Sequence, residues 1–285
     1  MTAQPPSLEL VDQAAPPANF DIAVLSDLGT NRENNEDACG FWIESADTVV
    51  LVVADGIGGY EGGEVASQMA VEITLASYRE SPPAWGPAKR LARAVQRANI
   101  EIHNRALTVP ELRRMGTTLT AIAVSDGMLH AAHVGDCRVY LIRRNRIKQI
   151  TKDHTMVQEK VRMGMMSAAR ARTHPERSAL TRSVGHELIV SVDRITLPLL
   201  QHDRILVCSD GLHGVLEDHE LEQVSRGLRA EAACSRLIEV ANERGTADNL
   251  TVGFFTMDAP TGHHELKPPL WRRLTRIFSR SAALT

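Results

Sequence analysis

The stretch Val49-Val50-Leu51-Val52-Val53-Ala54-Asp55-Gly56-Ile57-Gly58-Gly59 decides the fold. Its continuous apolar run, rich in β-branched residues, predicts a buried strand. An aspartate then ends the strand, and the glycines that follow let the backbone approach a ligand closely. A buried carboxylate is costly unless a cation compensates its charge. The stretch therefore predicts a core strand that delivers Asp55 to a binding site.

Two further apolar runs end in the same way. Ala131-Ala132-His133-Val134 precedes Gly135-Asp136, and Ile205-Leu206-Val207-Cys208 precedes Ser209-Asp210-Gly211. Few cations stand beside these aspartates, so we expect a divalent metal to supply the positive charge. Ligands that are all oxygen favour Mg²⁺ or Mn²⁺ over Zn²⁺.

Two more acidic stretches lie in polar segments and also have ordinary interpretations. Glu36 and Asp37 alone would be solvated charge in a loop, and Asp248-Asn249 would be a turn before a strand. A tight turn before a helix would explain the glycines after Asp55, but not the aspartate itself. Together, the five acidic stretches fit a site for two metal ions.

Arg32 stands four and five residues before Glu36 and Asp37. A lone arginine in a loop is usually solvated, but a guanidinium also offers two parallel donors to a phosphate. Two metals roughly 3.5–4 Å apart, a bridging water and a phosphate-binding arginine describe phosphoester hydrolysis.

The chain of 285 residues is 43% apolar, enough for one large domain, and its net charge of −3 gives no indication of nucleic-acid binding. The four cysteines form no CxxC pair and predict buried thiols in a reducing compartment. No apolar run approaches the roughly 18 residues of a membrane span, and the N-terminus lacks a signal pattern. We therefore expect a cytoplasmic protein.

Hydrophobic periodicity predicts two groups of strands separated by helices. The expected strands cover residues 22–26, 38–43, 49–54, 117–124, 129–134, 138–143, 147–150, 189–195, 203–208 and 250–257. The expected helices cover residues 64–78, 87–107, 218–227 and 230–244. This order argues against alternating βαβ units and predicts an α+β fold of antiparallel sheets flanked by helices.

Three segments fall outside this pattern. Residues 1–19 contain two Pro-Pro pairs and predict a disordered leader. Residues 155–185 carry four methionines and many arginines, which we interpret as a mobile flap over the site. Residues 259–285 form a basic tail in which Trp271, Leu274, Ile277 and Phe278 recur at helical spacing. The tail is either a helix docked on its own domain or a contact with a partner or an anionic membrane surface.

The combined motifs resemble the metal-dependent protein phosphatases, the protein phosphatase 2C-like serine/threonine phosphatases, and their bacterial members most. The resemblance covers about residues 20–258, in family order. It rests on Ser26-Asp27-x-Gly29-x-x-Arg32-x-x-Asn35-Glu36-Asp37, Asp55-Gly56-x-Gly58-Gly59, Met115-Gly116-Thr117-Thr118, His133-Val134-Gly135-Asp136-x-Arg138, Leu180-Thr181-Arg182 with Gly185, Ser209-Asp210-Gly211-Leu212 and Asp248-Asn249-x-Thr251.

The resemblance implies a central β-sandwich in four α-β-β-α layers, with a binuclear Mn²⁺ or Mg²⁺ centre at one end. In that arrangement Asp55 bridges both metals, while Asp210 and Asp248 complete one shell. Glu36 and the carbonyl of Gly56 belong to the other shell.

The same resemblance implies the remaining roles. Asp37 orients the metal-bound water, Arg32 holds the phosphoryl group, and Asp136 with Asp210 binds a third, weaker metal. Ile57 departs from the histidine of many eukaryotic members, which leaves the acid that protonates the leaving alcohol unidentified.

Three further residues receive predictions of their own. Cys137 replaces the usual serine after Gly-Asp, and we expect this change to be silent. His133 and His154 are inviting as acids, but we interpret both as structural residues.

The expected function is hydrolysis of phosphoserine and phosphothreonine in proteins by attack of the metal-bridging water. We expect a monomer that reverses the action of a bacterial serine/threonine kinase and that has no nucleic-acid partner. One alternative is an inactive family member that serves as a binding module, but Glu36, Asp55, Asp210 and Asp248 all remain. A small-molecule phosphoesterase is the other alternative.

Overall fold

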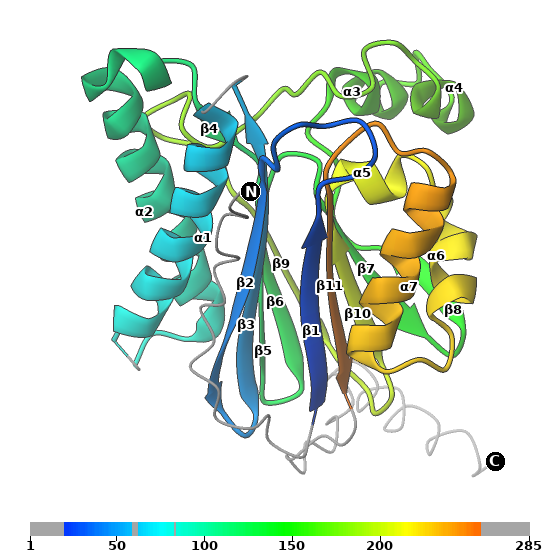
Figure 1. Cartoon of the computed structure of the whole chain (residues 1–285). Helices are drawn as coiled ribbons and strands as arrows, with labels where there is room; N and C mark the ends of the chain where they lie inside the picture. The colour runs from blue at the N-terminus through cyan, green and yellow to red at the C-terminus, as the bar shows by residue number, and fades with distance from the viewer. Residues whose placement is uncertain (1–19, 59–61, 83, 258–285) are drawn as a thin grey trace, which may run out of the picture.

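The computed structural model describes residues 20–58, 62–82 and 84–257. Two antiparallel sheets form its centre, and helices cover the outer face of each (Figure 1). One sheet has the strand order β1 (Phe20–Asp27), β11 (Leu250–Met257), β10 (Arg204–Cys208), β7 (Arg138–Arg143) and β8 (Arg146–Gln149). The other has the order β2 (Asp37–Ser45), β3 (Thr48–Ile57), β5 (Leu119–Ser125), β6 (Met128–Val134) and β9 (Asp193–Pro198), with β4 (Gly116–Thr117) paired to the end of β3.

Strand β3 shows why its apolar run is continuous. Val49, Leu51 and Val53 belong to the core between the two sheets, together with residues of β10 and β11. Val50 and Val52 point the other way, into the core beneath the helices. Because side chains alternate along a strand, both sets are buried only when each face of the sheet is covered. The predicted sandwich is therefore confirmed.

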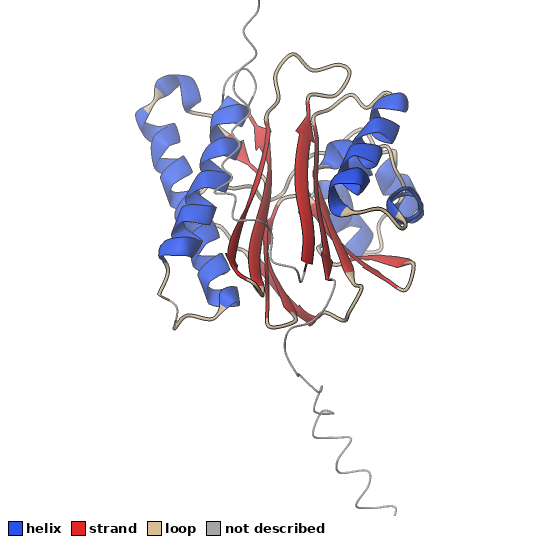
Figure 2. Cartoon of the chain, turned by 60° about the horizontal axis from the view of Figure 1, so that its bottom comes forward, coloured by secondary structure: helices blue, strands red, loops and turns tan. Residues whose placement is uncertain are grey.

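The helices divide between the two outer faces, as Figure 2 also shows. Helices α1 (Gly62–Glu80) and α2 (Pro87–Thr108) pack on the sheet that contains β3. Helices α5 (Asp210–His213), α6 (Asp218–Ser225) and α7 (Ala230–Glu243) pack beside the sheet that contains β10 and β11. A 3₁₀ turn, η1 (Pro110–Leu112), follows α2.

Residues 155–185 contain two short helices, α3 (Met156–Arg162) and α4 (Ala168–Arg172), which lie at the upper end of the sandwich (Figure 1). Each begins with a hydroxyl cap, since the side chains of Thr155 and Ser167 accept hydrogen bonds from Gln158 N–H and Arg170 N–H. The periodicity did not predict these helices, because seven and five residues are too short to show a repeat.

The prediction of a strand at residues 189–195 is wrong, because β9 spans Asp193–Pro198. Leu188 and Ile189, whose apolar character suggested the strand, are 54% and 74% exposed. The buried Asn99 side chain donates to the backbone carbonyls of Glu187 and Leu188, which holds this segment as a loop.

The predicted strand at 117–124 is interrupted at Thr118, because β4 ends at Thr117 and β5 begins at Leu119. The leader at 1–19 and the tail at 259–285 lie outside the described residues, so their predictions stay untested. None of the helices in the described part of the chain combines the length and the apolar character that a bilayer crossing requires.

Candidate active site

Asp55 and Asp37 face each other at the upper end of the second sheet, as partners across β2 and β3. Three hydrogen bonds fix the main chain of Asp55. Its N–H donates to Thr118 Oγ1 at 2.9 Å, while its carbonyl accepts from Thr118 N–H and Thr117 Oγ1, both at 2.8 Å. The break between β4 and β5 thus places the threonines where they hold the aspartate.

Asp37 is buried and is held by hydroxyl groups. Its Oδ2 accepts a hydrogen bond from Ser209 Oγ at 2.7 Å, and Ser209 Oγ in turn accepts from Thr251 N–H at 3.0 Å. Burial raises the pKa of Asp37 to about 7, although hydrogen bonds from Ser209 and Thr251 oppose the rise. The carboxylate therefore joins the ends of β2, β10 and β11.

Glu36 occupies a cradle that only glycine allows. Its carbonyl accepts from Gly56 N–H at 3.0 Å. A Cβ atom on Gly63, at the start of α1, would lie 2.7 Å from Glu36 Oε1, and one on Gly56 would lie 2.3 Å from the Gly63 carbonyl oxygen. Burial raises the pKa of Glu36, while the charge of Arg32 lowers it. The two glycines therefore let the main chain approach the Glu36 carboxylate closely.

Asn249 attaches the loop that carries Glu36 to the start of β11. Its Oδ1 accepts from Glu36 N–H at 2.9 Å, and its Nδ2 donates to the carbonyls of Leu28 and Asn34. The side chain is buried and uses three hydrogen bonds for this purpose. Asn249, the neighbour of Asp248 in the chain, therefore positions Glu36 near Asp248.

The carboxylates raise one another's pKa values. Burial raises the pKa of Asp55 well above its usual range, and the charges of Asp37, Asp210, Asp136 and Asp248 add to the effect in that order. Burial likewise raises the pKa of Asp210, and that of Asp136, which also feels Asp210. Like charges raise carboxylate pKa values in this way only when they lie close together. The predicted acids are therefore brought together at one end of the sandwich.

Arg32 lies at the edge of this group, half-exposed. Its Nη2 contacts Asp248 Oδ1 at 2.7 Å, with side-chain exposures of 43% and 40%. An exposed ion pair of this kind contributes little to stability. The guanidinium is therefore available to a different anion if the charge of Asp248 is compensated otherwise.

Within the described residues, no three of these carboxylates already converge as a closed metal shell. Asp37 and Asp55 nevertheless face each other across β2 and β3, and Asp136, Asp210 and Asp248 line one cavity. Asp248 has Arg32 as its partner, and Asp37 has Ser209. Carboxylate oxygens, together with the main-chain carbonyl of Gly56, are the kind of donor that Mg²⁺ or Mn²⁺ prefers.

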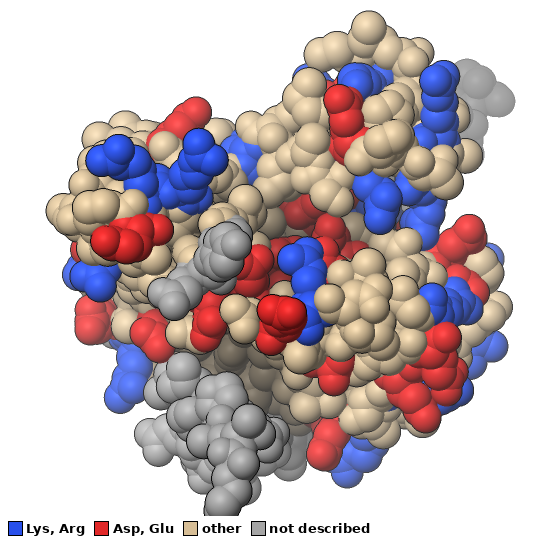
Figure 3. Space-filling model, turned by 45° about the horizontal axis from the view of Figure 1, so that its top comes forward, with Lys and Arg blue, Asp and Glu red and all other residues tan. Residues whose placement is uncertain are grey.

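A cavity of about 690 Å³ opens at the acidic end of the site and continues beneath α3 and α4. Figure 3 shows acidic side chains gathered in a hollow at this end of the molecule. Asp136, Asp210 and Asp248 line the cavity together with Arg177 and Ser178. Residues of the segment 155–185 therefore line the cavity, while the mobility predicted for this flap stays a prediction.

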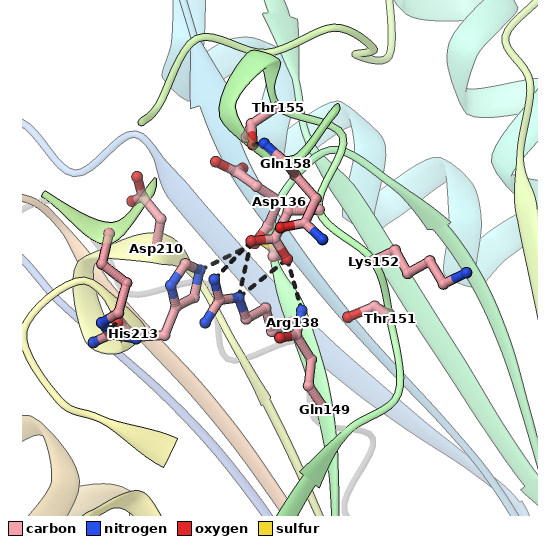
Figure 4. Close-up of polar contacts among 12 residues, drawn as sticks. Asp136, Arg138, Gln149, Thr151, Lys152, Thr155, Gln158, Asp210 and His213 are labelled. Atoms are coloured by element: carbon pink, nitrogen blue, oxygen red, sulfur yellow. Dashed lines mark hydrogen bonds and ion pairs between the residues drawn. The ribbon is translucent and has the colours of Figure 1, made fainter. Parts of the chain in front are cut away.

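Three residues in the site had no predicted role. Arg177 lines the cavity, and its charge lowers the pKa of Asp210. His213, buried on α5, donates from Nε2 to the Asp136 carbonyl at 3.0 Å (Figure 4). Thr118, which holds the main chain of Asp55, is the third of these residues. It belongs to the Met115-Gly116-Thr117-Thr118 motif, whereas His213 carries no local signal because its partner is distant in sequence.

Both histidines that were interpreted as structural have internal partners. His133 is completely buried between Thr120 Oγ1 and the Lys152 carbonyl, and burial lowers its pKa to about 4. His154 Nδ1 accepts from Gly135 N–H at 3.0 Å. Cys137 Sγ lies 3.1 Å from Thr118 Oγ1, where a serine would also form a hydrogen bond.

Comparisons with known proteins agree with this architecture. The family model described as Protein phosphatase 2C matches residues 29–252. A serine/threonine phosphatase, stp, of Listeria welshimeri is 34% identical over 231 residues, which cover 80% of this chain and 92% of that protein. The serine/threonine protein phosphatase PstP of Mycobacterium tuberculosis is 38% identical over 81% of this chain and 43% of its own length.

Solved structures give the same result. The crystal structure of the Mycobacterium tuberculosis phosphatase PstP/Ppp superposes with a TM-score of 0.77 at 36% identity and covers 85% of this chain and all of that one. The PstP catalytic domain in complex with two manganese ions has a TM-score of 0.74 at 35% identity, covering 84% of this chain and 98% of that one. From the motif order, the sandwich and these matches, this chain belongs to the protein phosphatase 2C family.

Proposed function

We propose that this protein is a metal-dependent serine/threonine phosphatase that removes phosphate from phosphorylated proteins. The observation that carries the proposal is the position of Asp55. It lies half-buried at the end of a core strand, opposite Asp37 across β2 and β3, where burial and the charges of four other aspartates raise its pKa. Such a concentration of negative charge is stabilised when divalent cations bind it.

The acids sort into two groups for metal binding. We assign Asp55 to both ions, and Asp210 and Asp248 to one of them. We assign Glu36 and the Gly56 carbonyl, next to the start of α1, to the other. Asp136, which adjoins Asp210 in the cavity, would hold a weaker third ion. When bound, the cations supply Lewis acidity toward the phosphoryl oxygens and a nucleophilic water at neutral pH.

The chain's own residues would bind and orient the reactants. Arg32 would exchange its contact with Asp248 for two hydrogen bonds to the phosphoryl group. Asp37, whose Oδ2 is fixed by Ser209, would present its other oxygen to the attacking water. Ile57 stands where many family members carry a histidine as the acid, so a water molecule rather than this side chain would protonate the departing alcohol.

The comparisons support phosphoproteins as substrates, and we infer that these are the products of a bacterial serine/threonine kinase. The relatives that match are themselves named serine/threonine phosphatases. All four cysteines are free thiols, three of them buried, which agrees with a reducing cytoplasm. We also propose that the protein acts as a monomer.

The test is hydrolysis of a phosphothreonine peptide by the full chain with Mn²⁺, after EDTA treatment, and after Mn²⁺ is restored. We expect activity to disappear in EDTA and return with the metal, while the circular dichroism spectrum shows that the protein stays folded. Full turnover in a metal-free buffer would exclude the proposed centre. A small chromogenic phosphate hydrolysed without any phosphopeptide activity would instead favour a small-molecule phosphoesterase.

A further inference from the structure

The cavity extends well beyond the acids that would hold metal. Its volume of about 690 Å³ lies within the range of sites that enclose a small ligand or a side chain of a larger one. Helices α3 and α4 form one wall, and the other wall consists of α5, the turn after it and the start of α6. The cavity therefore has two ends. The phosphate end lies beside Asp136, Asp210 and Asp248, and the second end lies beside the start of α6.

The two walls are attached to each other. Arg172 on α4 donates from Nη2 to the carbonyls of His213 and Leu216, both at 3.3 Å. At the base of the flap, Met156 N–H donates to the Ala179 carbonyl at 2.8 Å. The second end of the cavity is therefore a formed space, because side chain and main chain hold both of its sides.

The wall from the flap is partly apolar. Five of its lining side chains are small or aliphatic, namely Val157, Val161, Ala168, Ala169 and Ala171, and they lie beside the polar side chains of Thr155, Gln158 and Arg172. Ala168 and Ala169 are exposed to the space in front of them. This surface fits the methylene groups of a long side chain.

The opposite wall ends in two acids at the start of α6. Glu217 and Asp218 both line the cavity, with side chains 63% and 45% exposed. Glu217 Oε2 has the ring Nδ1 of His219 at 3.4 Å, and Asp218 Oδ1 accepts from Tyr140 Oη at 3.1 Å. Glu217 also accepts from Glu220 N–H as part of the capping box of α6. A carboxylate has about four lone-pair sites, so both acids keep acceptor capacity beyond these contacts.

The cations that line the cavity have partners of their own, and Asp218 is a distant partner of one of them. Arg138 forms a close ion pair with Asp153, with Nη2 to Oδ2 at 2.7 Å, and its Nη1 is 4.0 Å from Asp218 (Figure 4 shows Arg138 in this network). Arg172 is directed at the two carbonyls, and Arg177 acts on Asp210 at the phosphate end. Arg138 pairs primarily with Asp153 and only at 4.0 Å with Asp218, so the end near α6 keeps a surplus of negative charge beside the aliphatic side chains of α3 and α4.

We propose that this end of the cavity binds a lysine or arginine of the substrate protein that flanks the phosphorylated residue. The aliphatic stem lies against Ala168 and Ala169, and the charged head lies between Glu217 and Asp218. The proposal rests on the phosphatase function and adds a sequence preference to it. It follows from charge complementarity and from the continuity of this space with the acidic site.

The experiment uses phosphothreonine peptides that differ at single positions on either side of the phosphorylated residue. Each position carries lysine, norleucine or glutamate, so that the stem and the charge are varied separately. We expect one flanking position at which lysine gives roughly threefold to tenfold higher kcat/KM than norleucine, the scale of a partly exposed ion pair. Glutamate should be the poorest residue at that position.

Variants of the acids test where the preference arises. Glu217→Gln with Asp218→Asn removes both charges, but keeps acceptors for the cap of α6 and for Tyr140. This pair should abolish the difference between lysine and norleucine, and Glu217→Lys should favour the glutamate peptide. A matched control, Glu231→Gln with Glu243→Gln on α7, should leave the preference unchanged.

Hydrolysis of a small chromogenic phosphate with Mn²⁺ separates the two proposals. If this activity is absent from the parent protein, the phosphatase proposal fails. If it is present but the flanking residues make no difference, the lysine site is excluded. Equal rates for lysine and norleucine, or a preference for glutamate in the parent protein, would also overturn it.

Discussion

At the residue scale, the site consists of buried and half-buried aspartates, and hydrogen bonds fix the main chain of the central one before any ligand binds. Asp55 shows this most clearly, because Thr117 and Thr118 satisfy its backbone N–H and C=O. The carboxylate itself pays the desolvation cost, which raises its pKa. The fold therefore orients the charge and leaves its compensation to a cation.

Replacing Asp55 with asparagine should abolish most of the activity while the protein stays folded. The substitution keeps the shape but removes the charge that would contact both metals, so kcat should fall by at least about two orders of magnitude. Asp126→Asn, in the exposed turn between β5 and β6, serves as the control and should leave kcat unchanged. Near-normal kcat in a folded Asp55→Asn protein would place the centre elsewhere.

The metal-free protein should become more stable when the pH falls from 8 to about 6.5. A carboxyl group whose folded pKa is raised binds more protons in the folded than in the unfolded state, so stability is lost as the pH rises through the folded pKa. The pKa of Asp37 is about 7, and that of Asp55 is also raised.

The lower limit of this range is set by buried histidines. Burial lowers the pKa values of His133 and His213, to about 4 and about 3, so they oppose stability once the pH falls below about 6.5. Thermal unfolding in EDTA should therefore show a Tm that rises by a few degrees from pH 8 to 6.5. Saturating Mn²⁺ should raise the Tm and remove this slope, and a flat profile in EDTA would contradict the assignment.

Arg32→Ala should lower kcat/KM by roughly 10-fold to 100-fold, the scale of one hydrogen bond to a charged group. Mn²⁺ affinity measured by calorimetry should not weaken, because the substitution frees Asp248 from its ion pair. Arg32→Lys should recover only part of the loss, since an ammonium group lacks the two parallel donors. Unchanged kinetics in Arg32→Ala would assign the side chain to ordinary surface charge.

At the scale of elements, the four-residue helix α5 connects three parts of the site. It begins with Asp210 and ends with His213, whose ring donates to the Asp136 carbonyl and whose own carbonyl accepts from Arg172 of the flap. One short helix thus links the Asp210 strand end, the Asp136 loop and α4.

His213→Leu should therefore reproduce the effect of Asp136→Ala. Both variants should still bind two Mn²⁺ ions by calorimetry but turn over about tenfold more slowly, because the third, weaker ion is lost or displaced. His213→Gln keeps a donor near the Asp136 carbonyl and should recover most of the rate. If His213→Leu binds no metal, or if Asp136→Ala loses no activity, the role given to Asp136 is wrong.

The same elements show what the sequence could and could not predict. The run in β3 was readable, because a strand buried on both faces needs apolar residues at every position. Leu188 and Ile189 led to an incorrect start for the strand, because they are apolar yet exposed. Asn99 holds their loop through hydrogen bonds that no local sequence pattern indicates.

The site residues could be predicted where an acid directly follows an apolar strand. They were harder to predict where a side chain depends on a partner that is distant in the sequence. Asp55 and Asp210 could be recognised from their neighbours in the chain. The pairing of Arg32 with Asp248 spans the length of the domain, and neither residue's surroundings indicate the other. Side-chain partners of this kind are set by tertiary packing.

At the scale of the whole molecule, the sandwich supplies all of the residues proposed for catalysis. We predict that deleting residues 261–285 leaves hydrolysis of a small chromogenic phosphate within about twofold of the full chain, because the tail offers no metal-binding acid except Glu265. Binding to a protein partner or an anionic vesicle should weaken instead, in a salt-dependent manner. Unfolding or metal loss in the truncated protein would show that the tail is part of the domain.

The pairing of β1 with β11 has a consequence for the protein during its synthesis. These two strands lie at opposite ends of the described chain, yet they pair from Phe20 with Met257 to Asp27 with Leu250. A ribosome must therefore extrude nearly the whole domain before the first strand finds its neighbour. Asp248 and Asn249 emerge with that last strand, so a nascent or prematurely terminated chain has no complete centre and cannot remove phosphate from bystander proteins.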